Sequence, residues 1–204
     1  MEKIENIIFD LGGVLLDIDY NLTRNAFQQL GIIDFDKMYS QASADQLFQK
    51  LETGKISEPG FYKELNLRTG LHLAPEEIRK AWNAMLLDFR ESSLRFLDTI
   101  RSKYKIFLLS NTNHIHLDSF SKIFLNKIKE KSFEKYFDQA FYSCKIGLRK
   151  PDEICYEWVL KEIGIDPGKT LFVDDSEQNI GGAKKVGLQT IHLKTGKYIE
   201  DLGL

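Results

Sequence analysis

Acidic and small polar residues suited to phosphate chemistry stand at the ends of three short apolar runs in this 204-residue sequence. Asp10 ends the first run and precedes two glycines, whose backbone can approach a phosphate closely. Ser110 follows the second run, and the neighbouring acids Asp174 and Asp175 follow the third. Two adjacent carboxylates repel each other unless they share a cation, and hard oxygen ligands of this kind suit Mg²⁺. The pattern therefore predicts a magnesium site that can take a phosphate group.

Two further segments carry groups that could hold a phosphate. The run Ser-Asn-Thr-Asn at residues 110–113 offers hydroxyl and amide groups that can bind phosphate oxygens. Lys150 is a cation placed before Pro151, which restrains the lysine backbone. Each of these signals alone also fits a structural role. Asp10 could close an Asx turn, the polar run could cap a helix, and Lys150-Pro151 could begin one.

The three apolar runs have the length and composition of buried strands that end in turns. A helical segment precedes the second run and another precedes the third, so helix and strand alternate as in βαβ units. This order predicts an α/β fold with a parallel sheet, and ligands bind beyond the carboxyl ends of such strands. We expect strands at residues 4–9, 105–109, 139–143, 170–173 and 189–193, and helices at residues 92–103 and 153–163.

About ninety residues separate the first strand from the second, far more than an ordinary crossover needs. Their apolar spacing is helical, so an inserted helical domain is the economical explanation. We expect its helices at residues 22–30, 35–51, 58–67 and 75–89, and a further amphipathic helix at residues 119–135.

Four segments, in this order, resemble the motifs of the haloacid dehalogenase superfamily of hydrolases and phosphatases. Phe-Asp-Leu-Gly-Gly-Val-Leu-Leu-Asp at residues 9–17 is similar to the nucleophile loop, and Leu-Leu-Ser-Asn-Thr at residues 108–112 is similar to the second motif. Arg-Lys-Pro-Asp at residues 149–152 is similar to the lysine motif, and Val-Asp-Asp-Ser at residues 173–176 to the metal motif. The resemblance covers residues 5 to about 193.

The resemblance implies a Rossmann-like catalytic core of residues 1–16 and 92–204, with residues 17–91 inserted as a helical C1 cap that sets substrate specificity. It also implies phosphoryl transfer, in which an aspartate attacks phosphorus in line and water hydrolyses the aspartyl-phosphate intermediate. The implied catalytic residues are Asp10, Ser110 and Lys150. The implied substrate-binding residues are Ser110, Asn111 and Lys150, and the implied ligands of Mg²⁺ are Asp10, the backbone carbonyl of Gly12, Asp174 and Asp175.

One residue departs from the family's pattern. Family phosphatases usually carry a second aspartate two residues after the nucleophile, as general acid and base, and this sequence has Gly12 there. The loss could lower turnover by about 10² to 10⁴ unless the leaving group is good. The Phe-Asp-Leu-Gly start is similar to that of bacterial α-glucose-1-phosphate phosphatases, whose hemiacetal leaving oxygen needs protonation less. We therefore expect a sugar phosphate similar to α-glucose 1-phosphate as the substrate.

Two other functions fit parts of the pattern. A phosphate-ligand sensor or regulatory protein would keep the metal site without efficient turnover; Gly12 favours it, and Asp10 counts against it because a binder needs no nucleophile. A 2-haloacid dehalogenase needs no metal, and the acidic pair would repel its carboxylate substrate. His114 and His116, with Asp118, suggest a further metal site or, for His114, a substitute acid, although such histidines are more often capping or surface residues.

Composition narrows the class of partners. The chain has 28 Lys and Arg and 30 Asp and Glu, a net charge of -2, which is too balanced for a general nucleic-acid binder or a membrane-bound chain. No apolar run approaches the roughly 18 residues of a spanning helix, and the acidic start does not resemble a secretory signal, so we expect a cytoplasmic protein. The two cysteines form no Cys-x-x-Cys pattern and should be reduced. The expected partner is a small phosphate ester, bound by a monomer or a homodimer.

Overall fold

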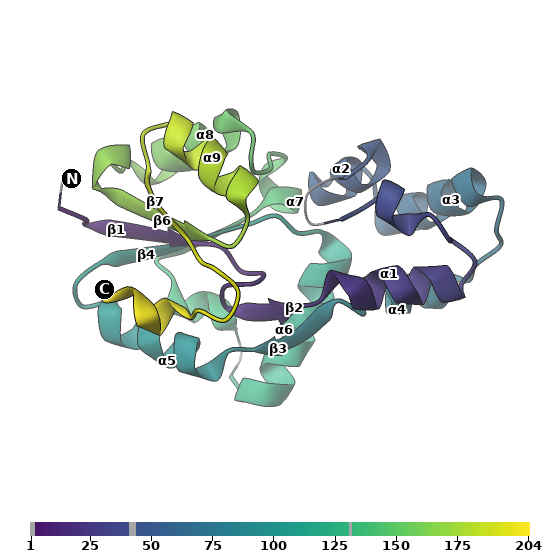
Figure 1. The fold of residues 1–204 in the computed structure, drawn as a ribbon, viewed down its shortest axis with the longest axis horizontal. Helices are drawn as coiled ribbons and strands as arrows, with labels where there is room; N and C mark the ends of the chain where they lie inside the picture. Colours follow the sequence, from purple (N-terminus) through teal and green to yellow (C-terminus); the bar gives the residue numbers. More distant parts are fainter. Residues whose placement is uncertain (1–2, 41–43, 131) are drawn as a thin grey trace.

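Five parallel strands form the central sheet of the protein (Figure 1). The computed structural model describes residues 3–40, 44–130 and 132–204. All four strand pairings are parallel. In their order across the sheet, the strands are β5 (Gln139–Tyr142), β4 (Lys105–Ser110), β1 (Asn6–Phe9), β6 (Thr170–Asp174) and β7 (Gln189–His192). The predicted α/β fold with a parallel sheet is confirmed.

Both faces of the sheet are apolar, as a parallel sheet covered by helices requires. Successive side chains of a strand point to opposite faces, so Ile7 and Phe9 join one core cluster and Ile8 joins another. The covering helices are α5 (Glu91–Ile100) and α6 (His114–Ile128) on the first face, and α8 (Glu153–Ile163) and α9 (Glu177–Lys185) on the second.

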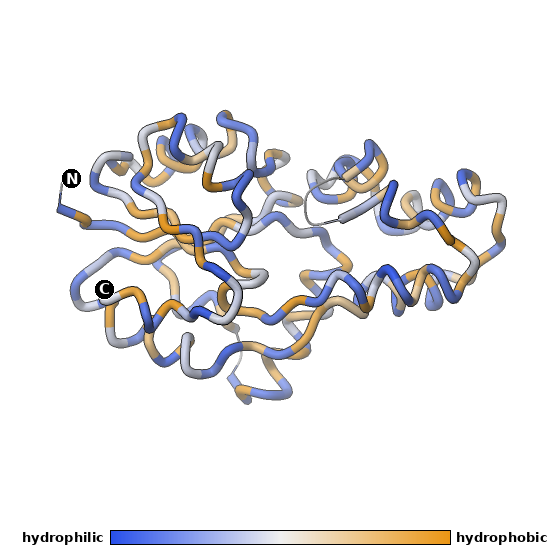
Figure 2. The backbone as a smooth tube through the Cα atoms, in the orientation of Figure 1, coloured by the Kyte–Doolittle hydropathy of each residue, from blue (hydrophilic) through white to orange (hydrophobic). Residues whose placement is uncertain are grey.

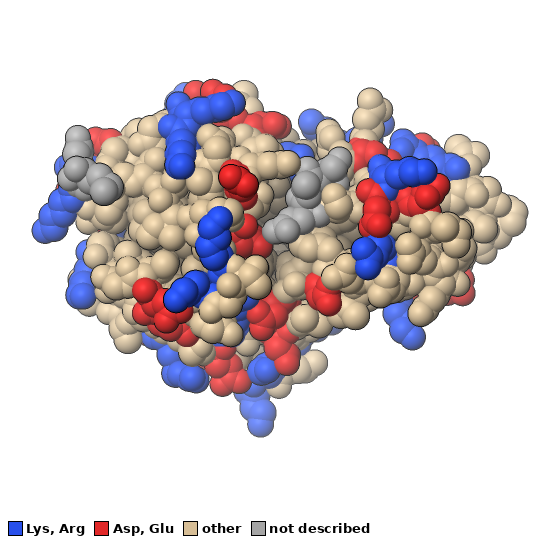
Figure 3. All heavy atoms as spheres, in the orientation of Figure 1, with Lys and Arg blue, Asp and Glu red and all other residues tan. Residues whose placement is uncertain are grey.

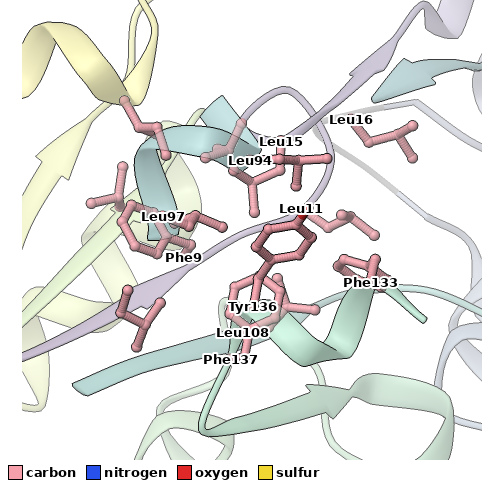
Figure 4. Close-up of a cluster of buried hydrophobic side chains, with 14 of the residues drawn as sticks. Phe9, Leu11, Leu15, Leu16, Leu94, Leu97, Leu108, Phe133, Tyr136 and Phe137 are labelled. Atoms are coloured by element: carbon pink, nitrogen blue, oxygen red, sulfur yellow. The ribbon is translucent and has the colours of Figure 1, made fainter. Parts of the chain in front are cut away.

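The core on the first face holds β1 in place (Figure 4). Phe9 packs there among leucines of α5 and aromatic side chains that include Phe133 of the short turn η2 (Phe133–Tyr136). Burying one large apolar side chain contributes roughly 1.5–3 kcal/mol, so this cluster fixes the end of β1, where Asp10 stands. Hydrophobic residues are concentrated along the strands of the sheet (Figure 2).

A helical insert lies beyond the carboxyl ends of the strands (Figure 1). Its helices begin at capping residues Asp19, Asp45 and Ser57, whose side-chain oxygens accept hydrogen bonds from first-turn amides. The insert has its own core, in which Trp82 is fully buried. Its elements are α1 (Tyr20–Gln29), η1 (Phe35–Lys37), α2 (Gln46–Glu52), α3 (Glu58–Thr69) and α4 (Pro75–Asn83).

Two short strands join the helical insert to the sheet. β2 (Leu16–Ile18) and β3 (Leu86–Phe89) pair in antiparallel orientation. Arg90 fixes this junction, because its Nη1 donates to the carbonyl oxygens of Gly13 and Val14 at 2.8 and 3.0 Å. Its Nε also lies 2.6 Å from Asp17 Oδ1. Arg90 therefore ties the end of β3 to the loop that follows Asp10. The remaining short elements are α7 (Ser143–Ile146), η3 (Pro167–Lys169) and η4 (Ile199–Leu202).

Two helices predicted within the insert are wrong as single elements. The helix predicted at residues 35–51 is divided, because an antiparallel bridge between Tyr39 and Ala44 separates η1 from α2; residues 41–43 lie outside the described residues. The helix predicted at residues 75–89 ends at Asn83, since the last residues of that range form β3 and pair with β2.

The amphipathic helix predicted at residues 119–135 is shifted in the structure. As α6 it begins at His114, with Asn113 as its cap, and ends at Ile128. Lys129 then adopts a left-handed conformation with φ of 59°, which closes the helix. Lys131, within the predicted range, lies outside the described residues.

In the described part of the chain, no helix is long and apolar enough to cross a bilayer. Lys, Arg, Asp and Glu side chains are interspersed over the face shown in Figure 3, in keeping with the net charge of -2. Cys144 and Cys155 are buried free thiols.

Candidate active site

The ends of the three central strands bring the predicted polar residues together. Asp10 follows β1, while Ser110 and Asp174 are the last residues of β4 and β6, which flank β1. The register pairs Phe9 with Leu108 and Val173, so the three polar residues leave the sheet at nearly the same level. All three are buried.

Lys150 is fully buried and connects two of these strand ends. Its Nζ lies 2.8 Å from Asp10 Oδ1 and 2.7 Å from Asp174 Oδ2. A buried ammonium is costly unless it is paired, and the two carboxylates provide that pairing. Burial alone would lower the pKa of Lys150, but Asp10 and Asp174 raise it above its ordinary value, so the lysine stays charged.

Asn111 positions Lys150 through the backbone of the lysine. The Asn111 side-chain amide donates to the carbonyl oxygen of Lys150 at 2.8 Å, and its Oδ1 accepts the backbone N–H of Lys150 at 2.9 Å. The peptide bond between Lys150 and Pro151 is cis. The observed contacts of Asn111 hold the lysine, and its predicted contact with the phosphate stays a prediction.

Asp174 is held firmly by donors on its other side. The backbone N–H of Ser176 donates to Oδ1 at 2.8 Å. Asn179 Nδ2 lies 3.1 Å from Oδ1 and 3.0 Å from Oδ2. Together with Lys150, these donors fill most of the acceptor positions of the Asp174 carboxylate. Asp174 is therefore held in place as the ion-pair partner of Lys150.

Asp175 completes a cluster of three carboxylates. Asp10, Asp174 and Asp175 each offer an oxygen, and these oxygens lie within 4.8 Å of one another. A Cβ at Gly13 would stand 2.2 Å from Asp175 Oδ2, and the φ of Gly13 is +72°, so glycine is required for this approach. Three hard oxygen donors at this spacing fit Mg²⁺.

The protein alone does not balance the charge of this cluster. Burial raises the pKa of Asp10; the ammonium of Lys150 opposes that rise, and Asp174 and Asp175 add to it. Burial, with Asp174 next, raises the pKa of Asp175 to about 6. Burial and mutual repulsion thus both disfavour the ionised carboxylates, and a bound divalent cation would offset these costs.

A cavity of about 110 Å³ opens beside Asp10. The core contributes Gly12, Ser110, Asn111, Lys150 and Asp175 to its wall, among others. The helical insert contributes Tyr20, Tyr39 and Glu52, which the sequence analysis missed. The sequence offers one signal for Glu52. It lies four residues after Phe48 and therefore on the same, buried face of α2, where a charged residue is out of place unless it has a function.

Glu52 connects the insert to the core at this cavity. Its Oε2 accepts a hydrogen bond from Arg149 Nε at 2.9 Å, and its Oε1 accepts one from the Tyr39 hydroxyl at 3.0 Å. The residue is 3% exposed. Burial raises the pKa of Glu52, although Arg149 and Tyr39 both lower it.

His116 is buried at the cavity wall, whereas His114 and Asp118 are exposed. The His116 ring stacks on Trp82 with centroids 4.5 Å apart, and its Nε2 donates to the Trp82 carbonyl oxygen at 3.1 Å. Burial lowers the pKa of His116 to about 4, so the ring is neutral. Among the described residues, Asp10, Asp174 and Asp175 form the only group of three His, Cys, Asp or Glu side chains close enough to share a metal ion, so the structure does not bring His114, His116 and Asp118 together as such a group.

A family model for haloacid dehalogenase-like hydrolases matches residues 4–187. The chain belongs to this family. The D-ribitol-5-phosphate phosphatase of Bacteroides thetaiotaomicron is 36% identical to this haloacid dehalogenase-like hydrolase over 197 residues, which cover 95% of this chain and 93% of the relative. A sesquiterpene phosphatase of Aspergillus oryzae is 30% identical over 191 residues, covering 91% of this chain and 88% of the relative.

A solved structure gives the same result for the fold. A haloacid dehalogenase family enzyme from Bacteroides thetaiotaomicron, in complex with magnesium and inorganic phosphate, superposes with a TM-score of 0.86. The two chains are 31% identical, and the match covers 98% of each. The resemblance drawn from the motifs is confirmed for the superfamily and its hydrolase class.

Proposed function

We propose that this protein is a Mg²⁺-dependent phosphatase of a small phosphorylated carbohydrate. The observation that carries the proposal is Asp10, a buried carboxylate that contacts Lys150 at 2.8 Å and lies within 4.8 Å of two further acids. A site that only bound phosphate would gain nothing from a buried carboxylate at its centre, because like charges repel. The named phosphatases among the relatives support the same reaction class.

In the proposed reaction, Asp10 attacks phosphorus in line and the ester bond to the leaving oxygen breaks. The leaving oxygen takes its proton from water, because Gly12 has no side chain that could donate one. A water molecule then attacks the aspartyl phosphate, which releases inorganic phosphate and restores Asp10. Lys150 favours the ionised form of Asp10 and balances charge, while Ser110 binds a phosphate oxygen.

The acidic cluster would hold the cation in this proposal. Asp10 and Asp175 would be direct ligands, with the backbone carbonyl of Gly12, and Asp174 would assist from its hydrogen-bonded position. Bound Mg²⁺ would neutralise phosphate charge that otherwise repels the attacking carboxylate.

The helical insert would act as the cap in this reaction. The proposed division is a core of residues 1–16 and 92–204 and a C1-type cap of residues 17–91. Tyr20, Tyr39 and Glu52 support it, because they bring side chains of the insert to the cavity that contains Asp10.

The substrate proposed here is a sugar or sugar-alcohol phosphate. An anomeric ester such as α-glucose 1-phosphate suits the absence of an acid at Gly12, because its leaving oxygen is weakly basic. The relative that acts on D-ribitol 5-phosphate supports an open-chain alternative. The anomeric and the open-chain ester differ in whether the leaving oxygen must be protonated, so the rates of phosphate release from both separate the two alternatives.

The test is phosphate release from α-glucose 1-phosphate, glucose 6-phosphate and D-ribitol 5-phosphate, with Mg²⁺ or with EDTA. We expect release by the wild type with Mg²⁺, and none with EDTA or from Asp10→Asn. Asp118→Asn, an exposed acid on α6, is the matched control. Binding of phosphate esters without release would instead identify a sensor, and release of halide from a 2-haloacid would identify a dehalogenase.

A further inference from the structure

The insert side of the cavity carries a buried acid, Glu52, beside the hydroxyl group of Tyr39. Glu52, Tyr39 and Arg149 form one hydrogen-bonded group there, with Glu52 in the middle. Arg149 directly precedes Lys150, whose Nζ contacts Asp10, so this group is joined to the reaction centre by a single peptide unit. Glu52, Tyr39 and Arg149 line the same cavity of about 110 Å³ as Asp10, so a phosphate ester bound at Asp10 would place its tail in the space that this group lines.

Glu52 keeps hydrogen-bonding capacity after these contacts. Each of its oxygens accepts one hydrogen bond, from Arg149 or from Tyr39, whereas a carboxylate offers about four acceptor positions. Arg149 fixes the carboxylate from the core side and Tyr39 fixes it from the insert side. The acceptor is therefore oriented before a substrate arrives, which reduces the entropy lost on binding.

The charge of this wall selects among substrate tails. A second anionic group on the substrate cannot donate a hydrogen bond to Glu52 and would meet its carboxylate at short range, where Arg149 offsets only part of the repulsion. An alkyl tail would displace water from Glu52 and Arg149 without replacing its hydrogen bonds, which is costly for charged groups. A hydroxyl group can donate to Glu52, so a neutral tail with several hydroxyls fits both requirements.

We propose that Glu52 is a specificity-determining residue that accepts hydrogen bonds from hydroxyl groups of the substrate's tail, so that the site selects neutral polyol phosphates. The inference rests on the proposed phosphatase function and names the substrate class of that site. A purely structural link between insert and core is the competing explanation, and it predicts equal losses for every ester.

The experiment compares D-ribitol 5-phosphate with n-pentyl phosphate, an ester of the same chain length without hydroxyls. The quantity measured is the ratio of kcat/KM for the two esters, in the wild type and in Glu52→Gln. We expect the ratio to fall about tenfold or more in Glu52→Gln, mainly through KM for the polyol ester, because a neutral amide replaces the charged acceptor. A ratio that stays unchanged while both rates fall would overturn the proposal in favour of the structural link.

Two further variants keep the test independent of folding. Tyr39→Phe removes one hydroxyl that orients Glu52 and should lower the same ratio about threefold. Glu157→Gln, an exposed acid on α8, is the matched control and should leave the ratio unchanged. If Glu52→Gln does not fold, an unchanged ratio in Tyr39→Phe overturns the proposal.

Binding separates this inference from the proposed function. The affinity for D-ribitol 5-phosphate is measured by calorimetry with Mg²⁺ in Asp10→Asn, with and without Glu52→Gln. If the wild type releases no phosphate but Glu52→Gln weakens binding about tenfold, the proposed phosphatase is wrong and the polyol site stands. If Glu52→Gln leaves binding unchanged, the polyol site is wrong whatever the wild type hydrolyses.

Discussion

A Cβ atom added to Gly12 would lie 2.5 Å from Cδ1 of Ile18. Ile18 belongs to β2 and lines the cavity beside Asp10. Its side chain thus occupies the space that an aspartate at position 12 would need for its own side chain. Because Cδ1 is the far end of a flexible side chain, the clash can be relieved by shortening it. The missing acid and the isoleucine are therefore coupled features of this site.

This coupling predicts how a general acid could be added. Gly12→Asp combined with Ile18→Val should raise kcat for an ester with a basic leaving oxygen, such as glucose 6-phosphate, by at least about tenfold. Hydrolysis of p-nitrophenyl phosphate, whose leaving group needs no proton, should change little. Steady-state phosphate release measures both. Ile18→Val alone gives the baseline, and equal rates in it and the double variant would show that the added aspartate does not act as a general acid.

Lys150 should be essential for stability as well as for activity. Lys150→Met leaves Asp10 and Asp174 buried without their ammonium partner, which should cost about 3–5 kcal/mol of unfolding free energy near neutral pH. Removing the ammonium raises the pKa of Asp10 further, so the native state takes up a proton as pH falls. The destabilisation should therefore be smaller at pH 5 than at pH 8.

Urea unfolding of Lys150→Met and wild type at the two pH values measures this. Lys161→Met, on the exposed side of α8, is the matched control and should change stability little at either pH. A loss for Lys150→Met that does not depend on pH would contradict the charge argument.

The sequence predicted the site residues of the core better than those that the helical insert contributes. Asp10, Ser110 and Asp174 stand at strand ends, and the parallel order of the strands is enough to bring such residues together. The side chains contributed by the insert depend on how its helices pack on one another. The apolar spacing of residues 35–51 and 75–89 is helical, and it does not reveal the Tyr39–Ala44 bridge or the pairing of β3 with β2. Both predicted helices were therefore extended too far.

Magnesium should stabilise the folded protein through the acidic cluster. A ligand that binds the native state alone adds about 2.7 kcal/mol at a concentration one hundred times its Kd. We expect Tm to rise on addition of Mg²⁺ and to return to its starting value with EDTA. Asp175→Asn replaces a charged carboxylate ligand by a neutral amide and should reduce the rise, whereas Asp118→Asn should keep it. An equal rise in Asp175→Asn would place the cation elsewhere.

His116 should make the protein less stable as the solution becomes acidic. The pKa of His116 is lowered to about 4 in the native state by burial, against about 6.5 in an unfolded chain. Between these values the unfolded state binds the extra proton, so the contribution of the neutral ring is complete above pH 6.5 and is lost as pH falls towards 4. The full loss is about 3 kcal/mol.

The acids with raised pKa values, Asp10 and Asp175, change stability in the opposite direction over part of this range, so wild type alone does not isolate the effect of the histidine.

The measurement is therefore the difference in unfolding free energy between wild type and His116→Gln, by urea at pH 7.5, 5.5 and 4.5. At pH 7.5 the variant should be the less stable, because it loses the stacking on Trp82. As pH falls, wild type should lose stability relative to the variant, and the difference should change sign or shrink. His114→Gln, at an exposed position two residues earlier, is the matched control for replacing a histidine of α6. A difference for His116→Gln that stays constant with pH would mean that the ring is protonated without unfolding.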